Sequence, residues 1–236
     1  MKQFRFLSAL VLMAGTFFFS SCNGDEKKTE DKTVSKDSAA VTTSAPGCLM
    51  VIRHKVANYA AWLPAYEAHD SARLSYGIHS FLLARGTKDS NTVMVVLRAD
   101  DTAKARQFSM LPDLKLTMQK AGVIGAPTIQ LMNVQWRDTT SNVAKTRVLI
   151  THKVKDWDAW KKSFDSHKQI RVDAGLADRL VGYDVADNHS VSVALIINDV
   201  AKAEAFMNSK DLKDRMAEGG VVGPPDVFFY TVVKNY

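Results

Sequence analysis

The chain has 236 residues, which allows one or two domains. Hydrophobic residues make up 46% and charged residues 24% of the sequence, which is ordinary for a globular protein and excludes a chain that is disordered throughout. The formal net charge is +6, but basic and acidic residues are intermixed and no aromatic residues are interleaved with the basic ones. This pattern is typical of a solvated surface and argues against a nucleic-acid partner.

The N-terminus, residues 1–21, is predicted to be a signal peptide. Lys2 and Arg5 precede the apolar stretch 6–19, which is too short to span a bilayer comfortably. Small residues then lead into Cys22, and acidic residues follow. This motif resembles the lipobox of bacterial lipoproteins of the Bacteroidetes type. The resemblance implies lipidation of Cys22 and a place in the cell envelope, anchored to the outer membrane, with a periplasmic or surface-exposed orientation left open.

Residues 22–46 are predicted to be a disordered tether. They are rich in lysine, acidic residues, serine, threonine and alanine, and they hold almost no large apolar side chain. Such a segment cannot bury enough surface to offset its ordering entropy. We therefore expect membrane contact through the lipidated Cys22 only. A plain signal peptide that is cleaved nearby is the alternative.

The remainder of the chain is a tandem repeat. His54-Lys55-Val56 recurs 98 residues later as His152-Lys153-Val154, and the same ungapped shift continues to the last strand. Among the pairs it relates are Trp62 and Trp160, His69 and His167, Arg73 and Arg171, Gly77 and Gly175, Asp113 and Asp211, and Pro127 and Pro225. We assign the two units to residues 47–137 and 143–236, with a short polar linker over 137–142.

Each unit is predicted to have the element order β-α-β-β-α-β. Alternating β-branched residues indicate strands, Asn58 is an N-cap candidate, and Gly77 is a helix-ending glycine. The elements of the first unit are a strand over 49–56, a helix over 58–76, strands over 79–87 and 92–99, a helix over 101–121 that bends or breaks near Pro112, a glycine-rich turn over 122–127, and a strand over 128–134. The second unit repeats them.

This element order is that of the ferredoxin-like fold, whose four antiparallel strands carry both helices on one face. The other face is apolar and must be covered. We therefore predict an α+β protein in which two tandem ferredoxin-like units cover each other's sheets and form an eight-stranded barrel. Because the second unit supplies the partner, we expect a monomer with an internal pseudo-dimer.

The repeated motifs carry a family resemblance. A first strand ending in His-Lys-Val, a helix with Trp62, Tyr66 and His69, and the later Asp-Leu-Lys and Gly-Val-x-Gly-x-Pro segments resemble the dimeric α+β barrel superfamily. The similarity is to its antibiotic-biosynthesis-monooxygenase-like and cyclase-like members, and it covers residues 48–236. The resemblance implies the barrel fold. It does not name a reaction, because the superfamily contains cofactor-free monooxygenases, isomerases and haem enzymes.

The main candidate site is a stripe of side chains on the first helix of each unit. Spacings of four, three and four residues place them on one helical face. The stripe consists of Trp62, Tyr66, His69 and Arg73, repeated as Trp160, Phe164, His167 and Arg171. Aromatic rings with a guanidinium and an imidazole suit a pocket for a small anionic or aromatic ligand, with the arginine pairing a carboxylate. The alternative is a structural stripe, in which the aromatic residues anchor the core.

His54 and His152 are further candidates for the pocket wall, because each shares a strand face with apolar neighbours. The alternative is a satisfied core histidine. His54 and His69 together could bind a metal, but no carboxylate or cysteine lies at a suitable spacing to complete the site. No metal and no cofactor are therefore predicted. Cys48 has no mate in the second unit and is expected to be passive.

Three classes of function stay open. The first is an envelope lipoprotein that binds a small ligand in each unit. The second is a monooxygenase- or isomerase-like enzyme with His69 and His167 as candidate bases, although no asparagine matches the one that cofactor-free monooxygenases use. The third is a structural or interaction module without a pocket.

Overall fold

The computed structural model describes residues 47–140 and 144–236. The predicted signal peptide, the lipidation site at Cys22 and the tether over 22–46 lie outside the described residues. In the described ranges, every helix falls short of the length and apolar character needed to cross a bilayer.

The two units have the predicted element order. The helix over 101–121 breaks beside Pro112 as predicted, whereas the predicted first helix of each unit is also a pair of short helices. The first unit comprises β1 (Cys48–Val56), α1 (Tyr59–Ala68), α2 (Asp70–Leu74), β2 (Ile78–Gly86), β3 (Thr92–Ala99), α3 (Thr102–Ser109), α4 (Pro112–Lys120) and β4 (Val123–Arg137). The second unit comprises β5 (Thr146–Val154), α5 (Trp157–Ser166), α6 (Lys168–Asp173), β6 (Leu176–Asp184), β7 (Asp187–Ile197), α7 (Val200–Met207), α8 (Lys210–Glu218) and β8 (Val221–Asn235).

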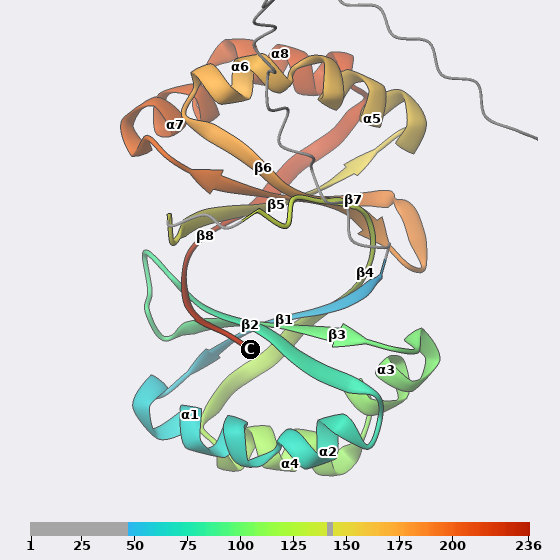
Figure 1. The fold of residues 1–236 in the computed structure, drawn as a ribbon, viewed down its shortest axis with the longest axis vertical. Helices are drawn as coiled ribbons and strands as arrows, with labels where there is room; N and C mark the ends of the chain where they lie inside the picture. The colour runs from blue at the N-terminus through green and yellow to red at the C-terminus, as the bar shows by residue number, and fades with distance from the viewer. Residues whose placement is uncertain (1–46, 141–143) are drawn as a thin grey trace, which may run out of the picture. The chain divides into compact units, whose positions relative to one another are not determined.

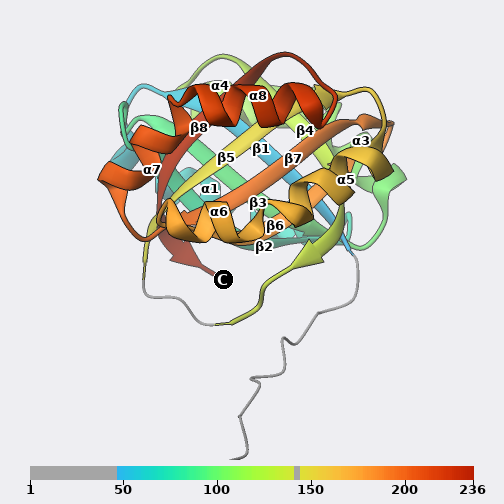
Figure 2. The same ribbon diagram turned by 90° about the horizontal axis from the view of Figure 1, so that it is seen from above.

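The eight strands close into a barrel in the order β1-β3-β2-β8-β5-β7-β6-β4, and all neighbours are antiparallel. The units meet at two seams, β2 with β8 and β4 with β6. Helices α1–α4 cover the outer face of one set of strands and α5–α8 that of the other (Figure 1), and the view in Figure 2 shows α5–α8 lying across the strands of the second unit. The predicted α+β barrel, built from two tandem ferredoxin-like units, is confirmed.

Strand alternation creates three apolar cores, because successive side chains point to opposite faces of a sheet. In β1, Leu49 and Val51 face the inside of the barrel, whereas Met50 and Ile52 face the helices. The inner core draws on both units, and each unit has its own core between helices and sheet. The barrel interior therefore joins the two repeats into one packed body.

Predicted helix ends are confirmed at several positions. The side chains of Asn58 and Asp156 each accept a hydrogen bond from the backbone N–H three residues later, at 3.0 and 2.8 Å. Gly77 and Gly175 follow the helix pairs with positive φ values of 65° and 72°, a conformation that favours glycine. Local sequence signals therefore predicted where each of these helix pairs begins and ends.

The prediction of one continuous helix over 58–76 is wrong, because the helix breaks at His69. The Arg73 Nη1 donates to the Tyr66 carbonyl at 2.8 Å, and the His69 N–H bonds the same carbonyl at 3.3 Å. A continuous helix would use this carbonyl for the residue four positions on. Arg171 makes the same bond to the Phe164 carbonyl, at 2.6 Å, and breaks the second copy at His167.

The predicted turn over 122–127 is also wrong beyond Gly122, because β4 begins at Val123. Val123 and Ile124 already pair with β1, and a bulge then absorbs residues 125–127 before regular pairing resumes. Gly125 in this bulge has a φ of 74°. The bulge lies opposite His54, and its copy in β8 lies opposite His152.

Candidate functional site

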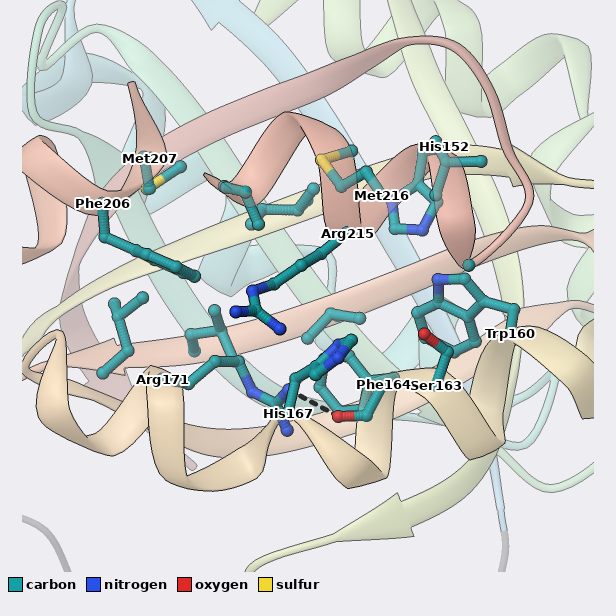
Figure 3. A pocket seen from close by; sticks show the side chains of 17 residues that line it. His152, Trp160, Ser163, Phe164, His167, Arg171, Phe206, Met207, Arg215 and Met216 are labelled. Atoms are coloured by element: carbon teal, nitrogen blue, oxygen red, sulfur yellow. Dashed lines mark hydrogen bonds between the residues drawn. The ribbon is translucent and has the colours of Figure 1, made fainter. Parts of the chain in front are cut away.

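Each unit has a cavity between its helices and its sheet, and the candidate residues of each unit meet there. The first cavity has a volume of about 60 Å³ and is lined by His54 together with the whole Trp62–Arg73 stripe. The second has a volume of about 100 Å³ and is lined by the equivalent residues His152, Trp160, Phe164, His167 and Arg171 (Figure 3). The broken helix thus still presents one continuous stripe to the cavity. The role of these candidate residues in binding a ligand stays a prediction.

His54 and His152 are buried in these cavity walls without hydrogen-bond partners. Their exposed fractions are 6% and 8%, and neither ring nitrogen of either residue has a partner in the described structure. Burial lowers the pKa of both imidazoles from 6.5 to about 4, so both are neutral near pH 7. A neutral imidazole offers one donor and one acceptor. Since buried polar groups are nearly always satisfied, a repeated pair of unsatisfied imidazoles needs a reason.

Stacked aromatic rings form one side of each cavity. Trp62 stacks on Tyr66 with 5.0 Å between ring centroids, and Trp160 stacks on Phe164 at 5.1 Å. The histidine lies against the tryptophan in both units, at centroid distances of 5.5 and 5.4 Å. The Tyr66 hydroxyl is already hydrogen-bonded to Ser80 at 2.9 Å. The aromatic residues therefore offer apolar surface, and the histidine offers the polar contacts.

The two stripe arginines are held by the protein itself. Arg171 donates from Nε and Nη2 to both carboxylate oxygens of Asp178 at 2.7 Å, and its guanidinium carbon lies 3.5 Å from the centroid of the Phe164 ring. Arg73 donates to Asp70 at 3.0 Å and lies 4.1 Å from the centroid of the Tyr66 ring. The bidentate edge of Arg171 is thus occupied. We therefore revise the expected carboxylate-binding role of Arg171 to one of shaping the cavity wall. For Arg73, whose buried Nε has no hydrogen-bond partner in the described structure, that role stays a prediction.

His69 and His167 lie at the helix breaks and are half-buried in the cavity linings. Burial and then the nearby Arg73 guanidinium lower the pKa of His69. His69 is therefore neutral near pH 7 and available to accept a proton. Because both histidines line a cavity, a ligand bound there would contact them, and both stay candidate bases.

Further residues line the second cavity and were missed in the sequence. Arg215 and Met216 on α8 reach this cavity, as do Ser163 and Met207 (Figure 3). The Arg215 Nε donates to Asp211 at 2.7 Å. The repeat does contain a signal for three of them, because the first unit has a different residue at the equivalent position: Thr117 for Arg215, Ala65 for Ser163 and Ser109 for Met207. The second cavity is therefore lined both by residues that the two copies share and by residues at which they differ.

Metal-binding chemistry finds little support in the described residues. No three histidine, cysteine or carboxylate side chains of the described ranges gather at a metal-binding distance. Cys48 is a half-buried free thiol, and burial, with a smaller effect from Asp184, raises its pKa. It stays protonated near pH 7 and is not an activated nucleophile.

No protein-family model matches the chain, and no curated protein is significantly similar to it. Among solved structures, a candidate monooxygenase from Fusobacterium nucleatum is similar with a TM-score of 0.54 and 16% identity, covering 80% of this chain and 94% of that one. An anthrone oxidase-like protein has a TM-score of 0.55 and 12% identity, with 80% and 92% covered. A candidate chlorite dismutase has a TM-score of 0.55 and 11% identity, with 80% and 96% covered.

These identities are low, so the likeness is one of fold. The similar structures are dimeric α+β barrel proteins, and the ring of eight strands with helices outside it agrees with them. The residues that line the two cavities were identified in this chain alone and not by comparison with the similar structures. The chain has the dimeric α+β barrel fold, with both of its units on one polypeptide.

Proposed function

We propose that this protein is a lipid-anchored envelope protein that binds a compact aromatic ligand between the helices and the sheet, above all in the second unit. The observation that carries the proposal is the buried, unsatisfied imidazole of His152 in the cavity wall. A ligand hydroxyl or carbonyl group would satisfy it, and the stacked Trp160 and Phe164 would contact the ring. Because Asp178 occupies the bidentate edge of Arg171, an aromatic ligand fits the second cavity better than a carboxylate.

The size of the cavities supports a small ligand. Cavities for drug-sized ligands are typically about 300–1,000 Å³, whereas an apolar cavity of about 150 Å³ holds benzene. The second cavity, of about 100 Å³, is smaller than either, so the ligand that it suits is no larger than a single ring. The first, of about 60 Å³, is smaller, and it is lined by Ala65 and Thr117 where the second is lined by Ser163 and Arg215.

Replacement of His152 by leucine tests the ligand site, with phenol as the probe. The wild-type protein is expected to bind phenol in a calorimetric titration, and His152→Leu to weaken binding about fivefold, because a buried hydrogen bond between neutral groups contributes roughly 1 kcal/mol. His54→Leu, at the equivalent position of the first unit, is the matched control and should leave the tighter site intact. Equal binding by wild type and His152→Leu would contradict the proposal.

Turnover in the same cavity is the second candidate function. The observation that favours it is the half-buried imidazole of His69 in the lining of the first cavity, repeated as His167 in the lining of the second. A ligand extracted from the purified protein and identified by mass spectrometry would supply the substrate to try. A rate that rises with pH and is lost in His167→Ala would favour an enzyme over a binding protein.

Cys22 tests the proposed location. Wild-type protein is expected to incorporate labelled palmitate and to sediment with membranes, whereas Cys22→Ser should incorporate none and be released, because several acyl chains are needed for stable anchoring. The released protein is expected to be a monomer in light scattering, since the barrel closes within one chain. A Cys48→Ser control should remain lipidated. Membrane association that persists in Cys22→Ser without label would refute the anchor.

A further inference from the structure

A third cavity lies inside the barrel, separate from the two cavities beneath the helices. It has a volume of about 130 Å³ and is lined by residues of both units. Its walls are mostly apolar and include Leu82, Met94 and Leu180. Three arginines line the same cavity, Arg137, Arg147 and Arg179, and they come from β4, β5 and β6. These three positively charged side chains contrast with the apolar residues that make up the rest of the barrel interior.

The arginines occur where the two repeats differ. Equivalent strands of the two units lie four places apart in the ring, so equivalent residues face each other across its axis. Each arginine faces an uncharged mate that lines the same cavity: Leu49 for Arg147, Phe81 for Arg179 and Asn235 for Arg137. The fold tolerates uncharged residues at these positions in one copy. The fold therefore does not require the arginines, which points to a ligand.

Arg147 is the most deeply buried of the three. Its exposed fraction is 8%, and its Nε has no hydrogen-bond partner within the described structure. Tyr230, with an exposed fraction of 3%, is its direct partner across the β5–β8 pairing. Burial raises the pKa of Tyr230 to about 12, so its hydroxyl stays protonated and can donate. A buried guanidinium without a full set of partners is costly unless an anion completes it.

The charge around the arginines is not balanced. Arg179 lies 3.8 Å from a carboxylate oxygen of Asp138, and both side chains are 21% exposed, so this end of the cavity reaches solvent. Burial, then Arg147, and with a smaller effect Arg137, lower the pKa of Arg179. Arg98, whose guanidinium lies 5.0 Å from the centroid of the Phe81 ring, adds a further positive charge. Arg147 and Arg179 therefore repel each other, while Asp138 and the Thr140 carbonyl, which accepts a hydrogen bond from Arg179 Nη1 at 2.7 Å, lie at the end that reaches solvent.

We propose that the barrel interior binds a compact organic monocarboxylate with an apolar body, such as an aromatic carboxylate. Its carboxylate is held by Arg147 and Arg179, with Tyr230 as a further donor. Its ring occupies the apolar part of the cavity, whose volume is close to that which holds one benzene ring. Paired arginines match a carboxylate because their fork of donors is complementary to its two oxygens.

Calorimetric titration of the purified protein with sodium benzoate tests this proposal. Wild-type protein is expected to bind one benzoate per chain, and at least tenfold more tightly than benzyl alcohol, which has the same ring without the charge. Arg147→Leu installs the residue of the first unit and is expected to weaken benzoate binding at least tenfold. Arg179→Gln, at a position whose side chain is 21% exposed, is expected to weaken it as well. Arg106→Gln removes an exposed positive charge from α3 and should have no effect.

Two further arms separate this site from the cavity beneath the helices. His152→Leu is expected to leave benzoate binding unchanged, so that loss of phenol binding and loss of benzoate binding are distinguishable. Inorganic phosphate is expected to compete poorly, because it lacks an apolar body. Absence of saturable benzoate binding, binding that Arg147→Leu and Arg179→Gln leave intact, or binding lost in His152→Leu would each overturn the proposal, as would equal competition by phosphate.

Discussion

Acidification from pH 7 to pH 4 is expected to destabilise the folded protein by several kcal/mol through His54 and His152. Burial lowers the pKa of both residues from 6.5 to about 4. Between these two values the unfolded chain binds protons that the folded chain does not, so the free energy of unfolding falls as the pH falls. At about 1.4 kcal/mol per pKa unit, each histidine contributes about 3 kcal/mol over this window.

Above pH 6.5 the effect is absent, because both histidines are neutral in the folded and the unfolded chain. Urea unfolding at a series of pH values measures the slope. The double variant His54→Leu, His152→Leu is expected to lose most of the pH dependence between pH 6.5 and pH 4. At pH 7 it should be no less stable than wild type, because the substitution removes unsatisfied polar groups from an apolar site.

His79→Leu is the control for the acid experiment. His79 is 45% exposed and bonds Asp100 at 2.9 Å, so its removal should leave the steep slope between pH 6.5 and pH 4 in place. An unchanged slope in the double variant would contradict the assignment to the buried pair. In that case the acid sensitivity would have to come from carboxylates elsewhere in the fold.

Asp178→Ala is expected to destabilise the protein by about 3–5 kcal/mol, because it leaves the buried guanidinium of Arg171 without its carboxylate. The side chains of Arg171 and Asp178 are only 7% and 9% exposed, and they form a bidentate pair. The pair also fixes the arginine that ends α5. Loss of its carboxylate should therefore loosen the cavity wall at Phe164. Denaturant unfolding at pH 7 gives the magnitude.

Asp70→Ala is the matched control in the first unit. Arg73 is buried like Arg171, but its partner Asp70 is 49% exposed, and solvent screens the pair. Its removal is expected to cost less than about 1 kcal/mol. Equal losses in Asp70→Ala and Asp178→Ala would show that burial of the partner does not set the cost.

The two arginines also show how the copies diverged. The position of Asp70 is occupied by Lys168 in the second unit, and the position of Ser80 is occupied by Asp178. Each buried arginine therefore keeps one carboxylate, supplied by α2 in one unit and by β6 in the other. This exchange supports a structural contribution of Arg73 and Arg171, because a partner was retained while its position changed.

Much of the fold could be predicted from the sequence, because its signals are local or repeated. Strand alternation, the N-caps Asn58 and Asp156 and the helix-ending Gly77 are read within a few residues of each other. The ungapped shift of 98 residues doubled every such signal. The apolar sheet face of each unit must be buried, and the other unit of the same chain can bury it.

The helix break and the long last strands could not be predicted in this way. The periodic stripe continues through His69, and only the bond from Arg73 to the Tyr66 carbonyl shows that the helix ends there. The glycine-rich segment after Gly122 has the composition of a turn, but pairing with β1 draws it into a strand. A side-chain bond seven residues along the same segment marks the helix break, and pairing with a distant strand extends β4.

The sequence by itself determined the repeat, the element order and the residues that the two copies share, since these depend on periodicity and on self-similarity. Only the tertiary structure decided which of those residues lack a partner. It placed His152 in a mostly apolar wall, where neither ring nitrogen has a hydrogen-bond partner among the described residues, and it brought Arg137, Arg147 and Arg179 together from three strands. The physical reason is that burial and charge balance depend on which distant side chains meet in space, and neighbours in sequence do not reveal that.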